Sequence, residues 1–152
     1  MSVDSAAGVR PALVGRLAAG IAGGLVGGLV FGIMMALDGM MPMIAQLVGS
    51  ESVAVGWVVH FAIAAFIGGT FALIFSALAR SVMAAIGLGL GYGAIWWVLG
   101  PMLIMPAWLG MTEMVFVWND TTRSSLLGHL IFGVLLGLVY GLAAPRLGRQ
   151  GR

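Results

Sequence analysis

Long runs of uncharged residues divide the chain into four apolar segments. Charge-free intervals of 21, 28, 32 and 22 residues lie between Arg16 and Asp38, Glu51 and Arg80, Arg80 and Glu113, and Arg123 and Arg146. A helix needs about 20 apolar residues to cross a bilayer, so each interval predicts one transmembrane helix. We expect these helices near 16–37, 53–78, 82–104 and 124–143. The first apolar stretch is too long for a cleavable signal peptide and lacks a small-residue cleavage site after it.

The composition agrees with an integral membrane protein. Of the 152 residues, 61% are hydrophobic and 8% are charged, and the mean hydropathy is +1.12. A soluble domain is about 25% charged, so a cytosolic enzyme, a nucleic-acid-binding protein and a disordered chain are excluded. The lipid bilayer is therefore the main expected partner. The chain has no cysteine, which excludes disulfides, zinc–thiolate sites and iron–sulfur clusters.

The distribution of charge predicts the orientation. One side of the predicted bundle carries six of the seven arginines: Arg10, Arg16, Arg80, Arg146, Arg149 and Arg152. The other side carries Arg123 and four acids: Asp38, Glu51, Glu113 and Asp120. Arginine is enriched on the cytoplasmic side, so we expect a multi-pass protein of the cell (inner) membrane with both termini in the cytoplasm.

The connections between the spans differ in length. A very short turn at Arg80–Ser81 predicts a tight hairpin of the second and third spans. The longer connections, 38–52 and 105–123, are expected at the outer membrane surface. We expect short interfacial helices in them, around Met43–Val48 and Thr112–Val117.

Two offsets indicate an internal repeat. At an offset of 64, Gly23, Gly27, Met41 and Pro42 match Gly87, Gly91, Met105 and Pro106; at an offset of 69, His60, Gly68, Phe71 and Leu73 match His129, Gly137, Tyr140 and Leu142. A duplicated two-helix hairpin with a parallel pseudo-twofold axis along the membrane normal would explain both. The expected organisation is a cytoplasmic tail (1–15), two repeats (16–78 and 79–143) and a basic cytoplasmic tail (144–152).

Small residues recur at every fourth position of the spans, and this spacing predicts close helix packing. The runs are Gly20–Gly24–Gly28–Gly32, Ala64–Gly68–Ala72–Ser76, Gly89–Gly93 and Gly133–Gly137–Gly141, with Gly23–Gly27 and Gly87–Gly91 beside them. The five tryptophans gather toward the acidic side, as an interfacial belt does. Trp96 and Trp97 lie deeper and are candidates for lining a cavity.

The only two histidines, His60 and His129, are the first candidate site residues. Each begins the small-residue run of its helix at the four-residue spacing. Ionisable groups inside a membrane suggest function, and paired imidazoles would suit haem b, a chlorophyll-type pigment or a shared metal. The alternative is that each histidine anchors an outer loop through a hydrogen bond. A shared site requires the second and fourth spans to be neighbours near the pseudo-twofold axis, which is what we predict.

Methionines give a second candidate site. Nine of the eleven lie toward the outer face, and Met40, Met41, Met43 and Met105 are candidate copper ligands, because thioethers with imidazole suit Cu(I). Methionine is also an ordinary filler of apolar cores. No phosphate loop, nucleophile–base pair or pair of carboxylates on one span is present, so we expect no enzymatic activity.

The duplicated pattern resembles an uncharacterised family of small four-helix prokaryotic membrane proteins. The resemblance covers about 17–143 and rests on His60, His129, Met41-Pro42 and Met105-Pro106. It implies the four-helix fold and an association with membrane redox systems, and it implies no activity.

Three functions remain open. The first is a non-catalytic accessory or structural subunit of a larger electron-transfer complex, respiratory or photosynthetic, which would associate with other membrane subunits or with itself as an oligomer. The second is an autonomous protein that binds haem b, a pigment or copper through the histidine pair and the Met-rich loops. The third is a small transporter or channel.

Overall fold

The computed structural model describes the backbone of residues 3–147 and the side chains of residues 13–144. The helical elements, in chain order, are α1 (Val3–Leu37), α2 (Met41–Gln46), α3 (Val53–Phe75), α4 (Val82–Leu99), η1 (Gly100–Ile104), α5 (Met105–Trp108), η2 (Thr112–Met114) and α6 (Asp120–Leu147). Helix α1 continues through most of the predicted N-terminal tail. Of the predicted tails, residues 1–2 and 148–152 lie outside the described residues.

Four helical stretches are long and apolar enough to cross a bilayer. They are Leu13–Leu37, Val53–Phe75, Val82–Trp108 and Asp120–Ala144. Each matches a predicted span to within a few residues. The prediction of an all-helical, multi-pass membrane protein with four spans is therefore confirmed at this level.

The third span differs from the prediction because it continues past residue 104. Gly100 and Pro101 open a five-residue π-helical turn, η1, which passes directly into α5. Proline has no N–H to donate to the carbonyl four residues earlier. In the π-helical turn the hydrogen bonds reach five residues back, as from the N–H of Met105 to the carbonyl of Gly100.

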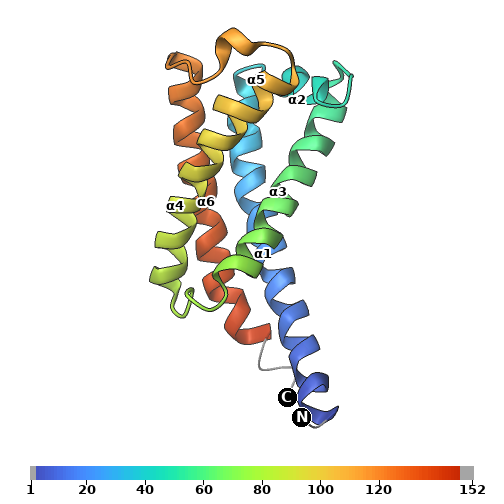
Figure 1. The fold of residues 1–152 in the computed structure, drawn as a ribbon, viewed down its shortest axis with the longest axis vertical. Helices are drawn as coiled ribbons and strands as arrows, with labels where there is room; N and C mark the ends of the chain where they lie inside the picture. Colours follow the sequence, from blue (N-terminus) through green and yellow to red (C-terminus); the bar gives the residue numbers. More distant parts are fainter. Residues whose placement is uncertain (1–2, 148–152) are drawn as a thin grey trace.

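Helices α1 and α6 form the centre of the bundle (Figure 1). Helix α3 packs on α1, α4 packs on α6, and α1 and α6 pack on each other. Helices α3 and α4 are consecutive spans, yet they have little direct contact. Helices α3 and α6 are not among the packed pairs, although the rings of Phe71 and Tyr140 meet with their centroids 5.3 Å apart. The prediction that the second and fourth spans are neighbours is therefore wrong.

Local hydrogen bonds fix where α4 and α6 begin. The hydroxyl of Ser81 accepts a hydrogen bond from the N–H of Ala84 at 3.1 Å, which caps α4 directly after the short turn predicted at Arg80–Ser81. At the start of α6, the Asn119 side chain accepts from the N–H of Thr122, and the Thr122 hydroxyl accepts from the N–H of Asn119, both at 2.9 Å. Reciprocal bonds of this kind satisfy N–H groups that have no partner within the helix.

Glycine lets the helix backbones touch, as the small-residue runs predict. A methyl group on Gly24 of α1 would overlap the carbonyl oxygen of Ala64 of α3. One on Gly89 of α4 would overlap the carbonyl oxygen of Gly133 of α6. These two interfaces, α1–α3 and α4–α6, therefore share one pattern of contact.

The same comparison explains why α1 and α6 are close while α3 and α4 are apart. Gly23 and Gly27 of α1 lie one residue before and three residues after Gly24. A Cβ on Gly23 would lie 2.8 Å from the carbonyl oxygen of Leu136 of α6, and one on Gly27 would lie 2.8 Å from that of Phe132. At the corresponding places around Gly89, α4 carries Leu88 and Tyr92. Glycine lets two backbones approach, whereas leucine and tyrosine hold them apart.

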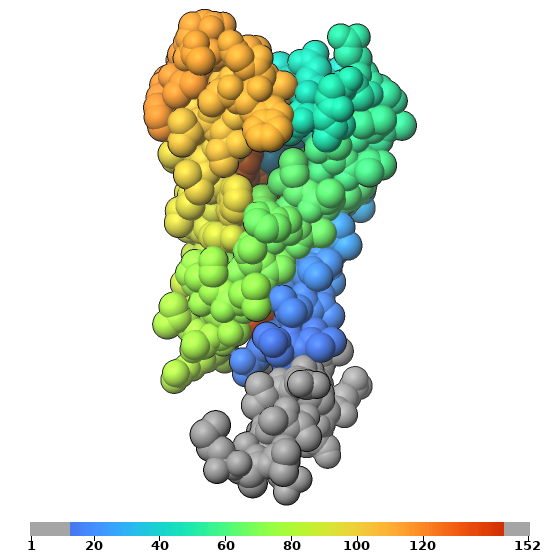
Figure 2. Space-filling model, turned by 45° about the vertical axis from the view of Figure 1, so that its right-hand side comes forward, coloured from blue at the N-terminus to red at the C-terminus, as the bar shows by residue number. Residues whose placement is uncertain are grey.

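Side chains bridge the gap between α3 and α4 from their joined end up to about the middle of the helices. The hydroxyls of Thr70 and Tyr92 are hydrogen bonded at 2.8 Å. The Tyr92 ring lies 5.7 Å from that of Phe71, and the Phe66 and Trp96 rings lie 6.2 Å apart. Beyond this point the helices diverge, and Figure 2 shows a hollow between them through which parts of α1 and α6 are visible.

The connections 38–52 and 105–119, at the end of the bundle opposite the beginning of α1 (Figure 1), meet over this hollow. Helix α2 begins two residues before the predicted helix around Met43–Val48, and the one predicted around Thr112–Val117 is only the short turn η2. The indole N–H of Trp108 in α5 donates to the carbonyl of Leu47, just after α2, at 3.1 Å. The two outer connections are thereby linked to each other.

Candidate functional site

His60 is a buried side chain that joins α3 to α1. Its Nε2 lies 2.8 Å from the carbonyl oxygen of Gly28. A carbonyl only accepts hydrogen bonds, so Nε2 carries the proton and donates it. Glycine at positions 28 and 32 of α1 makes room for the ring, since a Cβ at Gly32 would lie 3.1 Å from Cδ2 of His60. His60 is thus an anchor, and its partner is a helix backbone and not a loop.

His129 of α6 is partly buried, and it uses the other ring nitrogen, Nδ1, for the hydrogen bond that His60 makes with Nε2. Its Nδ1 lies 2.8 Å from the carbonyl oxygen of Ser125, one turn earlier, and therefore carries the proton. Among the described residues, Nε2 has no hydrogen-bond partner. It faces the π-helical turn of the third span, where a Cβ on Gly100 would lie 4.0 Å from it.

Phe31 of α1 stands between the two imidazoles. Its ring centroid lies 4.7 Å from that of His129 and 5.8 Å from that of His60, with edge-on geometry in both cases. Gly128 of α6 admits this ring, because a Cβ there would lie 3.0 Å from Cζ of Phe31 and closer to other ring atoms. The structure therefore does not bring the two imidazoles together on one shared metal.

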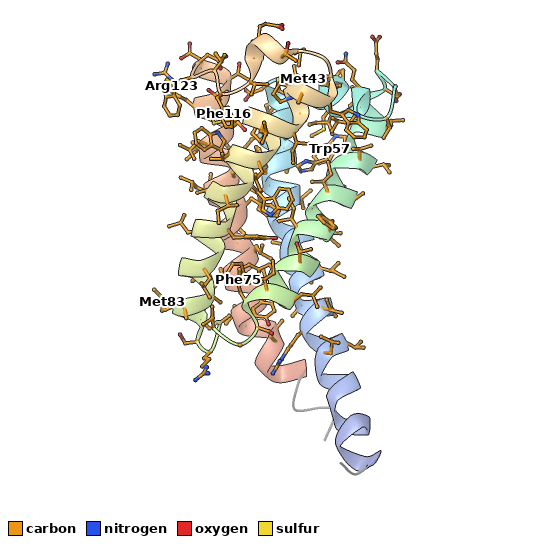
Figure 3. The ribbon with its side chains drawn as sticks, in the orientation of Figure 1. Met43, Trp57, Phe75, Met83, Phe116 and Arg123 are labelled. Carbon is orange, nitrogen blue, oxygen red and sulfur yellow. The ribbon has the colours of Figure 1, made fainter. Side chains whose placement is uncertain are left out.

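The histidines, Phe31 and the aromatic residues around them form what we call the histidine layer, toward the end of the bundle that carries α2 and η2. Trp57 lies one turn before His60 on α3, 6.2 Å from its ring. Figure 3 places Trp57 near this end, far from Phe75 toward the opposite end. Besides aromatic rings, the layer holds the two imidazoles, the Gly28 and Ser125 carbonyls, the Ser125 hydroxyl, which lies 3.3 Å from Nδ1 of His129, and the Trp57 indole N–H.

The candidate copper ligands lie at the starts of α2 and α5. Met41 is 1% exposed and fills the space between α2 and α3, where Gly56 leaves room for its carbonyl oxygen. Met40, Met43 and Met105 are partly buried. Among the described residues, no group of three histidine or acidic side chains could hold a metal ion.

The tryptophans divide into two sets. Trp108 and Trp118 are 71% and 59% exposed, as expected for an interfacial belt. The indole N–H of Trp97 donates to the carbonyl of Thr122 at 2.8 Å and ties α4 to α6. Trp96 lies between Tyr92 and Phe66, and its buried N–H has no hydrogen-bond partner among the described residues.

The charged groups lie at the ends of the spans. The Ser124 hydroxyl donates to the Asp38 carboxylate at 3.4 Å, which connects the end of α1 to the beginning of α6. Arg123 forms an exposed ion pair with Asp120, one turn away. These contacts fasten the ends of the two helices.

Sequence reasoning found the histidines and missed Phe31, which shapes their surroundings and looked like one apolar residue among many. The π-helical turn at Gly100 has a signal in the sequence, the Gly100-Pro101 step within the third apolar interval, because proline can break a helix. Turns of this kind are frequent at functional sites.

Comparison of the chain with protein-family models, curated proteins and solved structures gives no match. The resemblance stated above therefore stays a prediction, and the geometry of the histidine layer is the basis for a functional proposal.

Proposed function

We propose that this chain is a non-catalytic membrane protein that holds one lipid-soluble tetrapyrrole, of the haem b or chlorophyll type, on His129. The observation that carries the proposal is the open Nε2 of His129. A neutral imidazole whose other nitrogen donates to a carbonyl is the usual form of a metal-ligating histidine, because that bond fixes the tautomer and the ring orientation. Here the Ser125 carbonyl accepts that bond.

The asymmetry between the histidines favours one axial ligand in place of the pair expected from the sequence. His60 already uses Nε2 for its bond to Gly28. Phe31 lies between the two rings and separates them. The apolar and aromatic surroundings of His129 suit a flat ring.

The proposed ancestry and orientation agree with this picture. Gly24 and Gly89 have equivalent contacts, as do Ala64 and Gly133, which supports a duplicated hairpin with offsets of 65 and 69. The offset of 64 is not matched by contacts, since Gly23 packs against α6 while nothing lies within 4 Å of a Cβ on Gly87. We place the protein in the cell (inner) membrane with both termini cytoplasmic, so that the histidine layer lies toward the outer side.

Spectroscopy of the purified protein tests the proposal. The wild-type protein is expected to carry a Soret or chlorin absorption band that His129→Ala removes. His60→Ala is the matched control: it deletes the same side chain from the same layer, and the band is expected to persist. Circular dichroism and gel filtration establish that both variants fold.

The other outcomes are informative. Loss of the band in both folded variants would indicate two axial imidazoles. A colourless protein that contains copper, with the copper lost on replacing Met40, Met41 and Met43, would replace the tetrapyrrole by a thioether site. A colourless protein with no metal would contradict cofactor binding altogether.

A second candidate is the accessory subunit of an electron-transfer complex, with or without its own cofactor. The observation that favours it is Phe116, which has a φ of +57° and is 56% exposed. A positive φ is costly for a bulky residue, and this one presents an apolar ring at the outer end of the bundle (Figure 3). Purification in mild detergent is expected to recover the chain with other membrane subunits and, for Phe116→Ser, to release it; a lone wild-type monomer would contradict this candidate.

A further inference from the structure

The indole N–H of Trp96 is, among the described residues, the buried side-chain donor that no hydrogen bond satisfies. Buried indole N–H groups usually find a partner in proteins. That of Trp97, the next residue, does so by donating to the carbonyl of Thr122. The interior of the bundle therefore holds a hydrogen-bond donor that the fold itself does not use.

We infer that the Trp96 N–H donates a hydrogen bond to a ketone on the rim of the ring that His129 binds. The inference rests on the proposed function and narrows its class of ligand. Chlorins of the chlorophyll type carry such a ketone on the ring, whereas haem b carries its oxygen atoms in carboxylates. The ligand is thus a neutral chlorin in place of a haem.

Trp96 and the open nitrogen of His129 meet the same short stretch of the third span. The N–H of Gly100 donates to the carbonyl of Trp96, so Gly100 lies one helical turn after Trp96. Because Cβ atoms four residues apart on a helix are about 5–6 Å apart, and a Cβ on Gly100 would lie 4.0 Å from Nε2 of His129, the Cβ of Trp96 lies within about 10 Å of that nitrogen. A ring whose central metal is on Nε2 can reach the indole through an oxygen atom at its rim.

Aromatic rings of two helices hold the indole in place. The Trp96 ring lies edge-on to that of Tyr92 of α4, with centroids 6.1 Å apart, and edge-on to that of Phe66 of α3, at 6.2 Å. The Tyr92 hydroxyl is hydrogen bonded to that of Thr70 at 2.8 Å, which fixes this neighbour as well. These contacts restrict the rotation of the indole, so its N–H is a donor of defined position.

The depth of Trp96 favours a neutral acceptor. Trp96 lies at the middle of the third span, Val82–Trp108, whereas the charged side chains that the structure describes lie at or near the ends of the spans or in the connections between them. A carboxylate inside the membrane is costly unless a positive charge pairs with it, and an indole N–H carries no charge. A ring ketone is uncharged and needs only the one hydrogen bond that Trp96 can donate.

Binding of two zinc chlorins that differ only in this ketone tests the inference. Zinc methyl pyropheophorbide carries the ketone on its ring, and its deoxo derivative has a methylene group in place of that carbonyl. With the full chain in lipid nanodiscs, we expect the ketone to bind about tenfold more tightly, which corresponds to about 1.4 kcal/mol. Trp96→Phe, which keeps an aromatic ring and removes the N–H, is expected to abolish the difference by weakening the ketone alone.

Resonance Raman spectra of the bound ketone give a second readout, which a purely structural role of Trp96 would not change. A hydrogen bond lowers the stretching frequency of a carbonyl, so we expect a lower frequency in the wild-type chain than in Trp96→Phe. Trp97→Phe is the matched control, because it removes an indole N–H that is already bonded to Thr122. The preference for the ketone and its lowered frequency are expected to persist in this variant.

The outcomes separate this inference from the proposed function. Equal affinity of the wild-type chain for the two chlorins, or a carbonyl frequency that Trp96→Phe leaves unchanged, would overturn the inference while the proposed function stood. Tighter binding of haem b than of the zinc ketone would also overturn the inference alone. If neither chlorin nor haem b binds, the proposed function fails and this inference with it.

Discussion

The glycines of α4 belong to two faces, and only one of these faces has to be glycine. Gly89 and Gly93 lie against the backbone of α6, where a methyl group would overlap the carbonyl oxygens of Gly133 and His129. Gly87 and Gly91 are exposed, and nothing lies within 4 Å of a Cβ built on either. The alternate glycines of α4 therefore comprise two that pack against a neighbouring helix and two that contact nothing.

This difference gives a prediction at the scale of single residues. Gly89→Ala forces the backbones of α4 and α6 apart, and overpacking of this kind costs about 1–3 kcal/mol. Gly91→Ala meets no neighbour and relieves the conformational entropy of a helical glycine, which is worth about 0.5–1 kcal/mol. Unfolding by titration with sodium dodecyl sulfate in mixed micelles measures both free energies. Equal effects of the two substitutions would contradict the packing described for α4 and α6.

At the scale of elements, the sequence predicted the spans well because the bilayer dictates their length and polarity. It predicted the turn at Arg80–Ser81 for the same reason, since the charge marks where the chain leaves the apolar region. The order of helices around the bundle could not be predicted in this way. It depends on whether Gly23 and Gly27 or Leu88 and Tyr92 face a neighbour, and a run of small residues does not say which helix it meets.

For the candidate site, the sequence identified the residues but not their hydrogen-bond partners. His60 and His129 stand out because imidazoles are rare within a span. Which nitrogen each uses depends on the Gly28 carbonyl of another helix and on the Ser125 carbonyl of the same helix. Equivalent positions in a repeated pattern suggested equivalent roles. The side chain that breaks this equivalence, Phe31, has no signature in the sequence.

At the scale of the whole molecule, the charges at the two ends of the bundle bear on its orientation. Arg80 lies in the turn between α3 and α4, at the same end as the beginning of α1 and the end of α6 (Figure 1). Among the described residues, Arg123 is the one arginine at the opposite end, where it is paired with Asp120. The orientation bias counts arginines and is not a rule of net charge, so the uneven number of arginines at the two ends is what favours cytoplasmic termini.

Cysteine labelling tests this orientation, because the chain has no cysteine of its own. Val48, at the end of α2, and Leu78, in the turn after α3, are 60% and 61% exposed and so form a matched pair. In intact cells, a membrane-impermeant maleimide is expected to label Val48→Cys and to leave Leu78→Cys unlabelled until the membrane is permeabilised. The reverse pattern would place Arg80 and both termini outside. The histidine layer would then lie toward the inner leaflet.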